Sequence, residues 1–154
     1  MAMNYSQITP YLYVGTTPHR KHYQQLSQQG IKLAINMRID YFWFSRKPLF
    51  GVNTAWVPTV DIIFLPIKAE KLLPVATQAS ELIQNKQGVL SFCRMGRHRS
   101  VAMACAILIT QGYTAKQAMD LVKDKRPVAD PYISHIANTI NHFEQLWLQK
   151  NKPQ

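Results

Sequence analysis

The sequence predicts an α/β fold in which helices flank a central, mainly parallel sheet. Short apolar runs alternate with longer amphipathic patterns along most of the chain, and the C-terminal third carries helical patterns alone. The chain has 154 residues, of which 47% are apolar, which is enough for one sizeable core. We therefore expect a single domain that spans residues 1–154.

The first elements are an extended segment, a helix and a buried strand. Residues 8–14 alternate apolar and polar side chains and predict a short edge strand or an extended pair. Thr17 is a candidate N-cap for a helix that starts at Pro18 and ends at Gly30. Residues 31–37 form an apolar run between a glycine and a charge, as expected of a buried strand.

The middle of the chain predicts a loop, a strand and a helix. Residues 39–51 are rich in aromatic side chains and show no helical or strand period, so we expect a loop. Residues 56–60 predict a short strand that leads to Asp61. Residues 74–87 form an amphipathic pattern that begins with proline and is followed by glycine, which predicts a helix.

The remaining elements are a strand, a loop and three helices. Residues 89–92 predict a brief strand, residues 93–99 a loop, and residues 100–111 a buried helix. Thr114 and Gln117 match a capping box for a helix that continues to about residue 125. Asp130 as N-cap and Pro131 in the first turn predict a last helix that ends near residue 149.

The composition favours an anionic partner and a cytoplasmic setting. Eighteen Lys and Arg residues against eight Asp and Glu residues give a formal charge of +10, which suits nucleic acid, anionic lipid or phosphorylated substrates. The N-terminal residues do not resemble a secretory signal, and no apolar run is long enough to span a bilayer. His19 and His22 lie in a polar stretch that predicts a solvated surface and no metal site.

The two cysteines are expected to play different roles. If the chain is helical after Cys93, Cys105 lies about 18 Å from it along the helix axis, which is beyond disulfide reach. Cys105 falls in the buried helix, so we expect it to pack in the core. Cys93 stands where a strand meets a loop, where α/β proteins bind ligands.

The loop after Cys93 has the features of an anion site with a reactive thiol. A tight glycine-containing loop before a helix offers converging backbone N–H groups and the positive end of the helix dipole. The same groups stabilise a thiolate and lower the cysteine pKa from its usual value of about 8.5. Arg99 at the end of the loop is suited to bind two phosphate oxygens.

Cys93, Gly96, Arg99 and Ser100 match the Cys-x5-Arg signature of the cysteine-based protein tyrosine phosphatases. The rest of the chain resembles the small dual-specificity branch, in segments that cover most of the domain. These segments are ITPYLYVG, LAINM, WVPTVD, CRMGRHRSVAMACAIL and KRPVADP. The resemblance implies a protein-tyrosine-phosphatase-like fold of dual-specificity type.

The resemblance also implies a role for each matching residue. Cys93 is expected to be the nucleophile that forms a phosphocysteine intermediate, and Arg99 to stabilise the phosphoryl oxygens. Asp61 stands at the family's general-acid position, with Asp40 as our second choice. Ser100 is expected to donate a hydrogen bond to the sulfur. No metal or cofactor is implied, because Arg99 and the backbone dipoles supply the positive charge.

Two features depart from the family pattern. Phe92 occupies the position before the nucleophile where the family usually has histidine, so we expect a higher Cys93 pKa than in relatives with that histidine. The loop also carries extra side chains that we expect to contact the substrate together with the glycine, namely Arg94, Met95, Gly96, Arg97 and His98. Basic loops of this kind are similar to those of phosphoinositide and phosphatidylglycerophosphate phosphatases.

Three functions remain open on these residues. The first is a dual-specificity protein phosphatase that acts on phosphotyrosine and also on phosphoserine or phosphothreonine. The second is a phosphatase of anionic phospholipids, in which the aromatic residues Tyr41, Phe42, Trp43 and Phe44 either touch a lipid surface or cover the core. The third is a module that binds phosphorylated partners without turnover. We expect no nucleic-acid partner, allow for peripheral membrane contact, and expect a monomer.

Overall fold

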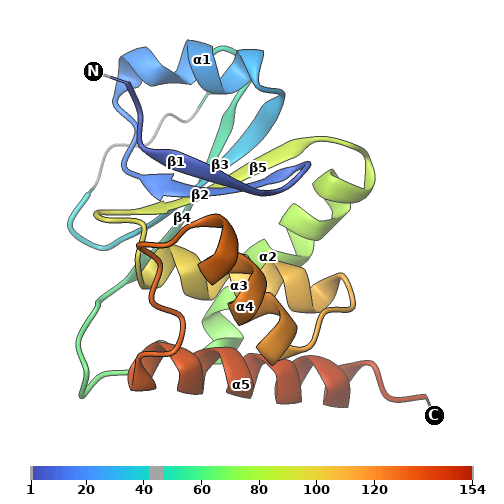
Figure 1. Ribbon diagram of the computed structural model, residues 1–154. Coiled ribbons are helices and arrows are strands. Elements are labelled where there is room, and N and C mark those ends of the chain that lie inside the picture. Colours follow the sequence, from blue (N-terminus) through green and yellow to red (C-terminus); the bar gives the residue numbers. More distant parts are fainter. Residues whose placement is uncertain (1, 42–46, 154) are drawn as a thin grey trace.

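A computed structural model describes residues 2–41 and 47–153 of the chain. Five strands form one sheet in the order β1-β2-β5-β3-β4, and helices cover both of its faces (Figure 1). The strands are β1 (Tyr5–Thr9), β2 (Leu12–Thr16), β3 (Ile31–Arg38), β4 (Asn53–Thr59) and β5 (Gly88–Cys93). The helices are η1 (Arg20–His22), α1 (Tyr23–Gln28), α2 (Ala69–Gln84), α3 (Arg99–Thr110), α4 (Ala115–Lys125) and α5 (Ser134–Lys150). The expected α/β architecture is therefore confirmed.

The sheet is mainly parallel, as expected. Strand β5 lies at its centre and pairs in parallel with β2 and β3, and β3 pairs in parallel with β4. Only the pairing of β1 with β2 is antiparallel. The carboxyl ends of the four parallel strands consequently meet at one edge of the sheet.

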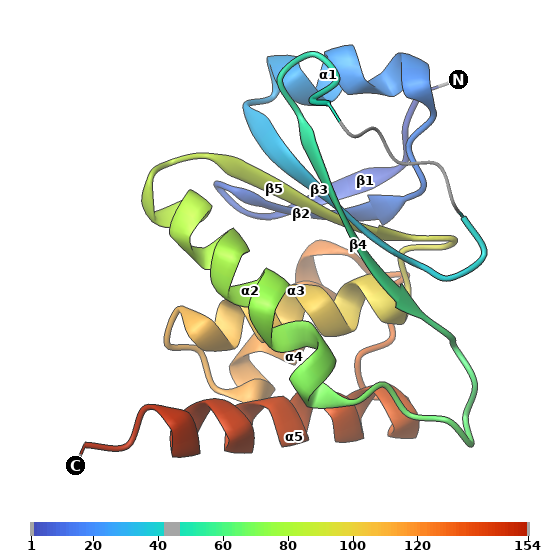
Figure 2. The ribbon, with the colours of Figure 1, turned by 180° about the vertical axis from the view of Figure 1, so that it is seen from behind.

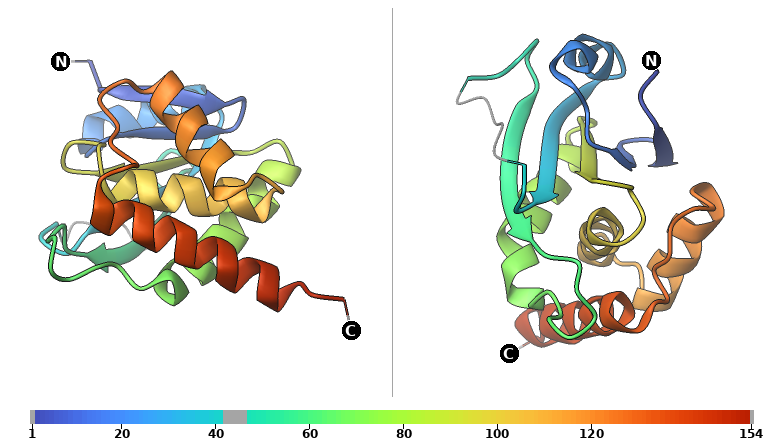
Figure 3. Two further views of the ribbon diagram at one scale, coloured as in Figure 1. Left: turned by 60° about the horizontal axis from the view of Figure 1, so that its bottom comes forward. Right: turned by 90° about the vertical axis from the view of Figure 1, so that its left-hand side faces the viewer.

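The two faces of the sheet are covered unequally. Helix α1 lies on one face, and α2 to α5 form a thicker layer on the other (Figures 1 and 2). In the right-hand view of Figure 3, α3 lies in the middle of this layer, surrounded by α2, α4 and α5. Its ten residues from Ser100 to Ile109 are all buried. Among the described residues, no helix has both the length and the apolar character needed to cross a bilayer.

The start of the chain forms a hairpin. Residues 8–14 do not make one strand, because β1 ends at Thr9 and β2 begins at Leu12. The turn contains Pro10, which cannot donate to a ladder and therefore interrupts the extended segment. β1 is the edge strand, while β2 continues the parallel sheet.

The predicted helix after Thr17 is shorter than expected. The chain makes the 3-10 turn η1 and then the six-residue α1, which is anchored by buried Tyr23 and Leu26. Thr17 does not cap this helix, because its hydroxyl donates to the Cys93 carbonyl, 3.1 Å away. His22 is not solvated as expected: it is buried, and its Nδ1 accepts from the backbone N–H of His19 at 3.0 Å.

Two later helices begin away from their predicted starts. α2 starts at Ala69, so that Pro74 lies inside it and removes one helical hydrogen bond. Burial of Ala69 and Leu72 stabilises the first turn in spite of that loss. α5 starts at Ser134, because the backbone N–H of Asp130 donates to the Arg97 carbonyl at 2.9 Å and ties residues 130–133 to the loop after β5.

Elements specified by local patterns agree with the prediction. β3 and β5 match the two buried runs within a residue, and α3 is displaced by one residue. β4 begins three residues before the predicted start. The Thr114 hydroxyl accepts from the Gln117 N–H at 3.1 Å, and Gln117 Oε1 accepts from the Thr114 N–H at 2.9 Å, which confirms the capping box of α4.

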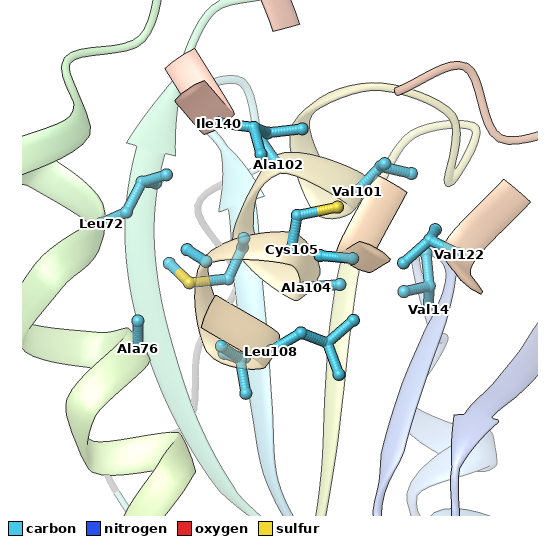
Figure 4. Close-up of a cluster of buried hydrophobic side chains, with 14 of the residues drawn as sticks. Val14, Leu72, Ala76, Val101, Ala102, Ala104, Cys105, Leu108, Val122 and Ile140 are labelled. Atoms are coloured by element: carbon cyan, nitrogen blue, oxygen red, sulfur yellow. The ribbon is translucent and has the colours of Figure 1, made fainter. Parts of the chain in front are cut away.

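The largest core lies between the sheet and the helical layer. Figure 4 shows side chains of α3, among them Leu108 and Cys105, packed against Val14 of β2, Leu72 and Ala76 of α2, and Ile140 of α5. A second cluster fills the space beneath α1 and contains Tyr23, Leu26, Leu90 and Phe92 among others. Strand β5, from which the loop emerges, is therefore held between two well-packed layers.

Truncation of the α3 core should weaken the fold. Leu108 is fully buried, so we expect Leu108→Ala to lower the free energy of unfolding by about 3 kcal/mol through lost burial and a residual cavity. Chemical denaturation followed by circular dichroism measures this change. Leu148→Ala is the matched control, because Leu148 is 58% exposed on α5, and we expect a change within about 0.5 kcal/mol. Equal losses in the two variants would contradict the packing described here.

Candidate active site

The parallel strands bring several polar side chains to one edge of the sheet. Thr17 follows β2, Asp40 follows β3, Asp61 follows β4, and Cys93 is the last residue of β5. In Figure 1 these strand ends, the loop after β5 and the segment that leads into α5 gather on the left of the molecule. The edge is the position at which open α/β sheets bind ligands.

Cys93 is buried at the base of this edge and is surrounded by donors. Its Sγ lies 3.1 Å from the Ser100 hydroxyl, and the backbone N–H groups of Ser100 and Gly96 also donate to the sulfur. Burial acts to raise the pKa of the Cys93 thiol, but these hydrogen bonds and the charge of Arg99 outweigh it, so the pKa is lowered from its ordinary value. The site thus favours a thiolate.

Gly96 has a conformation and a position that only glycine suits. Its φ angle is +64°, in the left-handed region. A Cβ atom at this position would lie 2.6 Å from an Arg126 side-chain nitrogen and 2.9 Å from the Gly15 backbone. The close approach lets the loop fold tightly enough to direct its N–H groups at the sulfur.

Arg126 holds the loop after β5 through hydrogen bonds to its backbone carbonyls, a role that the sequence did not predict. Its side chain is buried, and it donates to the carbonyls of Gly96 at 2.8 Å and Met95 at 3.3 Å. It also donates to Asn4 Oδ1 at 3.1 Å and to Ser6 Oγ at 3.0 Å, which links the loop to β1. Arg126 belongs to the KRPVADP segment, whose resemblance to the family is the sequence feature that could have identified this residue.

Arg99 stands at the N-terminus of α3 with its guanidinium facing the same edge. Its NH1 donates to the Thr59 carbonyl at 3.2 Å, and NH1 lies 4.0 Å from Asp40 Oδ1. Its Nε is buried and makes no hydrogen bond with the described residues. A planar fork of donors held in this way suits two oxygens of a phosphate group.

Asp61 is placed beside the loop by two histidines. Oδ2 lies 2.7 Å from His98 Nδ1, and Oδ1 lies 2.8 Å from His135 Nε2. Burial acts to raise the Asp61 pKa, while the hydrogen bonds from His135 and His98 act to lower it and prevail. His135 on α5 was missed by sequence reasoning, because nothing in the pattern of α5 indicates that this residue faces the strand end.

Asp40, our second choice for the acid, is held in a different way. Arg38 donates to Oδ1 from Nε at 3.0 Å and to Oδ2 from NH2 at 2.9 Å. This bidentate hydrogen bond lowers the Asp40 pKa to about 2. The pKa of Asp61 is lowered as well, so this direction does not separate the two carboxylates. Their positions do, because Asp61 lines the pocket with Cys93 and Asp40 does not.

The four side chains between Cys93 and Arg99 differ in their contacts: two are hydrogen-bonded within the protein, and the other two are exposed. Arg97 Nε donates to the Val128 carbonyl at 3.2 Å, and His98 binds Asp61. Arg94 and Met95 are exposed, and Arg94 makes no ion pair with the part of the chain that the structure describes. Arg97 and His98 are therefore partly committed to structural contacts.

Phe92 lies on the opposite face of β5 from the sulfur. Its side chain is buried in the cluster beneath α1, whereas Cys93 belongs to the core on the α3 side. Successive side chains of a strand alternate between faces, which explains this separation. Cys105 is fully buried in α3, where burial raises the pKa of its thiol, as expected of a packing residue.

A pocket of about 260 Å³ opens at this edge. It is lined by Asp61, Cys93, Arg94, Met95, Arg97, His98 and Arg99. Three of the residues predicted for catalysis or substrate contact do not line it: Gly96 and Ser100, which are buried, and Asp40, the second choice for the acid. Tyr41 lies under the Arg38 guanidinium, 5.1 Å from it, while Phe42, Trp43 and Phe44 fall outside the described residues.

Comparisons with known proteins agree with this geometry. The family model "Dual specificity phosphatase, catalytic domain" matches residues 12–145. Dual specificity phosphatase 28 of Mus musculus is 27% identical over 154 residues, which cover 97% of this chain and 90% of that protein. Dual specificity protein phosphatase 8 of Mus musculus is 26% identical over 153 residues, which cover 93% of this chain but only 21% of that protein.

Solved structures support the same fold. The crystal structure of a mouse putative dual specificity phosphatase complexed with zinc tungstate superposes with a TM-score of 0.83 at 24% identity, and covers 97% of this chain and 92% of that one. The structure of PTPMT1 in complex with PI(5)P gives a TM-score of 0.82 at 18% identity, with 96% and 99% of the two chains covered.

The thiol pKa can be measured through alkylation. We expect the rate of Cys93 modification by iodoacetamide to rise with pH around a midpoint below the ordinary thiol value of about 8.5. Ser100→Ala removes a donor to the sulfur, which destabilises the thiolate, so the midpoint should move to higher pH. Cys93→Ser provides the blank, because Cys105 is buried. A midpoint at or above the ordinary thiol value, or no shift in Ser100→Ala, would contradict this view of the site.

Proposed function

The chain belongs to the dual-specificity phosphatase family of cysteine-based phosphatases, and from this premise we propose that Cys93, Arg99, Asp61 and Ser100 hydrolyse phosphomonoesters. The observation that supports this proposal is the close assembly around one thiol. A buried sulfur receives donors from Ser100 and the loop, and it shares a pocket with a guanidinium and a carboxylate. A nucleophile, an oxyanion clamp and a proton donor are the groups that phosphoryl transfer needs.

In the first step the Cys93 thiolate attacks phosphorus. The S–P bond forms while the bond between phosphorus and the leaving oxygen breaks, with the two reacting atoms in line. Arg99 and the backbone N–H groups of the loop stabilise the equatorial oxygens as their charge redistributes. Asp61 donates a proton to the leaving oxygen, which would otherwise depart as an alkoxide or phenoxide.

In the second step water replaces the thiolate. Water attacks the phosphocysteine and gives a proton to the Asp61 carboxylate, which its two imidazole partners hold in place. The S–P bond breaks, and phosphate and the thiolate are released. The Ser100 hydroxyl, 3.1 Å from Sγ, donates a hydrogen bond to the departing sulfur and so stabilises its negative charge.

We propose phosphotyrosine, and with it phosphoserine and phosphothreonine, in protein segments as the substrates. The curated relatives that match the chain are named as dual specificity phosphatases. Cys93 shares the pocket with the exposed residues Arg94, Met95 and Arg97, so a side chain carried on a peptide can reach it from solvent.

One observation favours phospholipid substrates as a second candidate. The segment after Asp61 exposes four apolar side chains, namely Ile62 (49%), Ile63 (55%), Phe64 (90%) and Leu65 (58%). An apolar tip beside the pocket, on a chain with a formal charge of +10, suits an anionic membrane surface. The PTPMT1 neighbour, which shares the fold, was solved in complex with PI(5)P.

The acid role of Asp61 predicts a selective loss of activity. Asp61→Ala should reduce kcat/KM by about 10²-fold or more for alkyl and phenyl phosphates, whose leaving groups need a proton, and by much less for nitrophenyl phosphates. Steady-state kinetics on a series of aryl phosphates provides the measurement. Asp40→Ala serves as the control and should show no such dependence on the leaving group. An equal loss on all substrates in Asp61→Ala would assign the proton donor elsewhere.

A substrate panel separates the functions. Phosphate release is measured from a small aryl phosphate, phosphopeptides, and phosphoinositides both in water-soluble form and in vesicles, with wild type, Cys93→Ser and Phe64→Ser. We expect wild type to turn over the aryl phosphate and phosphotyrosine peptides, Cys93→Ser to be inactive, and Phe64→Ser to retain activity on soluble peptides.

Other outcomes would overturn the protein-phosphatase proposal. A preference for phosphoinositides by orders of magnitude, with a loss in Phe64→Ser confined to vesicles, would identify a lipid phosphatase. Phosphopeptide binding without turnover by wild type, together with the same binding by Cys93→Ser, would identify a binding module.

A further inference from the structure

Three metal-ligating side chains meet beside the phosphate loop. They are Asp61 after β4, His98 in the loop and His135 on α5, and one ligand atom of each lies within 4.8 Å of the others. Within the described residues they are the only group of three His, Cys, Asp or Glu side chains arranged in this way. We propose that these residues bind one Zn²⁺ ion and that this binding reversibly inhibits the enzyme, an effect on turnover that rests on the proposed function.

The geometry needs only a small change to hold the ion. His98 Nδ1 and His135 Nε2 approach different oxygens of Asp61, at 2.7 Å and 2.8 Å. Tetrahedral zinc with bonds of 2.0–2.2 Å separates its ligand atoms by roughly 3.3–3.6 Å. Two adjustments convert the hydrogen-bonded group into a three-ligand site: the two contacts lengthen by about 0.5–0.9 Å, and the three ligand atoms, now within 4.8 Å of one another, settle at the zinc separation. The imidazole protons that face the carboxylate are released when the ion binds.

The two imidazoles present to Asp61 the nitrogens that zinc would use. The opposite nitrogens, His98 Nε2 and His135 Nδ1, are buried and make no hydrogen bond with the described residues. His98 Nε2 lies 3.9 Å from Asp130 Oδ2, where a carboxylate can orient a zinc-bound imidazole from behind. The hydrogen bonds of both rings therefore converge on the Asp61 carboxylate, and the two rings lie against each other.

Charge and access suit a transition-metal cation. The side chains of His98 and His135 are 18% and 8% exposed, while that of Asp61 is 30% exposed and lines the pocket. An ion can thus enter from the pocket and keep one coordination position open to it. Two imidazoles and one carboxylate suit Zn²⁺ far better than Mg²⁺ or Ca²⁺, which prefer oxygen ligands.

Zinc would inhibit by removing the general acid. A carboxylate bound to Zn²⁺ can neither donate a proton to the leaving group nor accept one from water. Inhibition should therefore resemble Asp61→Ala: strong for substrates with poor leaving groups and weak for nitrophenyl phosphates. Binding at Cys93 would instead inhibit all substrates equally, because it removes the nucleophile.

The binding test removes the competing thiolate. Zn²⁺ is titrated calorimetrically into the intact chain carrying Cys93→Ser, after chelator treatment, and we expect one ion per chain. Adding His135→Gln should weaken the affinity by at least about tenfold, because a direct ligand is lost. His142→Gln is the matched control: it removes an exposed histidine two turns along the same helix and should leave the affinity unchanged. His98→Asn provides a second ligand variant, and circular dichroism checks that each variant is folded.

The outcomes distinguish this proposal from the proposed function. No binding to Cys93→Ser, or equal weakening by His135→Gln and His142→Gln, would overturn the zinc site.

In the activity experiment, Zn²⁺ should inhibit hydrolysis of phenyl phosphate by wild type, a chelator should restore turnover, and His135→Gln should be less sensitive to the ion. Inhibition of His135→Gln at the same zinc concentration as wild type would overturn the regulatory effect. If chelator-treated wild type binds added Zn²⁺ but hydrolyses no phosphoester before the ion is added, the proposed function is refuted while the zinc-site proposal stands.

Discussion

The hydrogen bonds that the buried Arg126 guanidinium donates to the loop after β5 are the interaction on which the active site depends. Desolvation of a cation is costly, and here it is offset by acceptors on two segments of the chain: the loop carbonyls of Met95 and Gly96, and the side chains of Asn4, just before β1, and Ser6 in β1. The anchor holds Gly96 in its left-handed conformation, and Gly96 in turn directs an N–H at Cys93. Thiolate formation thus depends on a residue that does not line the pocket.

The position before the nucleophile acts from the far side of the sheet. Phe92 packs in the cluster beneath α1, so its side chain and the Cys93 sulfur face opposite layers. A side chain there reaches the thiol only through the backbone of β5. The donors that lower the Cys93 pKa come from Ser100, Gly96 and Arg99, all on the α3 side. Phenylalanine at this position is therefore compatible with a thiolate-forming site, and its consequence is limited to the size of the pKa shift.

The sequence predicted those parts of the structure that local patterns specify. The buried strands, the capping box at Thr114 and the strand–loop–helix around Cys93 depend on neighbouring residues, and they were predicted closely. The predictions for Thr17 and Asp130 as caps were wrong, because distant partners, the Cys93 and Arg97 backbones, engage both residues. Arg126 and His135 were missed for the same reason: their roles depend on contacts with the loop and with Asp61, which only the packing of the helical layer creates.

The extra charge of the loop divides between structure and recognition. Arg97 is bound to the Val128 carbonyl and His98 to Asp61, so neither contributes its full donor capacity to an incoming phosphate. Arg94 is exposed at the pocket mouth and retains its donors, and Met95 beside it is 58% exposed. A count of positive charges thus overstates how strongly the loop selects multiply phosphorylated substrates. Arg94, Met95 and the apolar segment after Asp61 are the exposed side chains that the proposed substrates would meet next to the pocket.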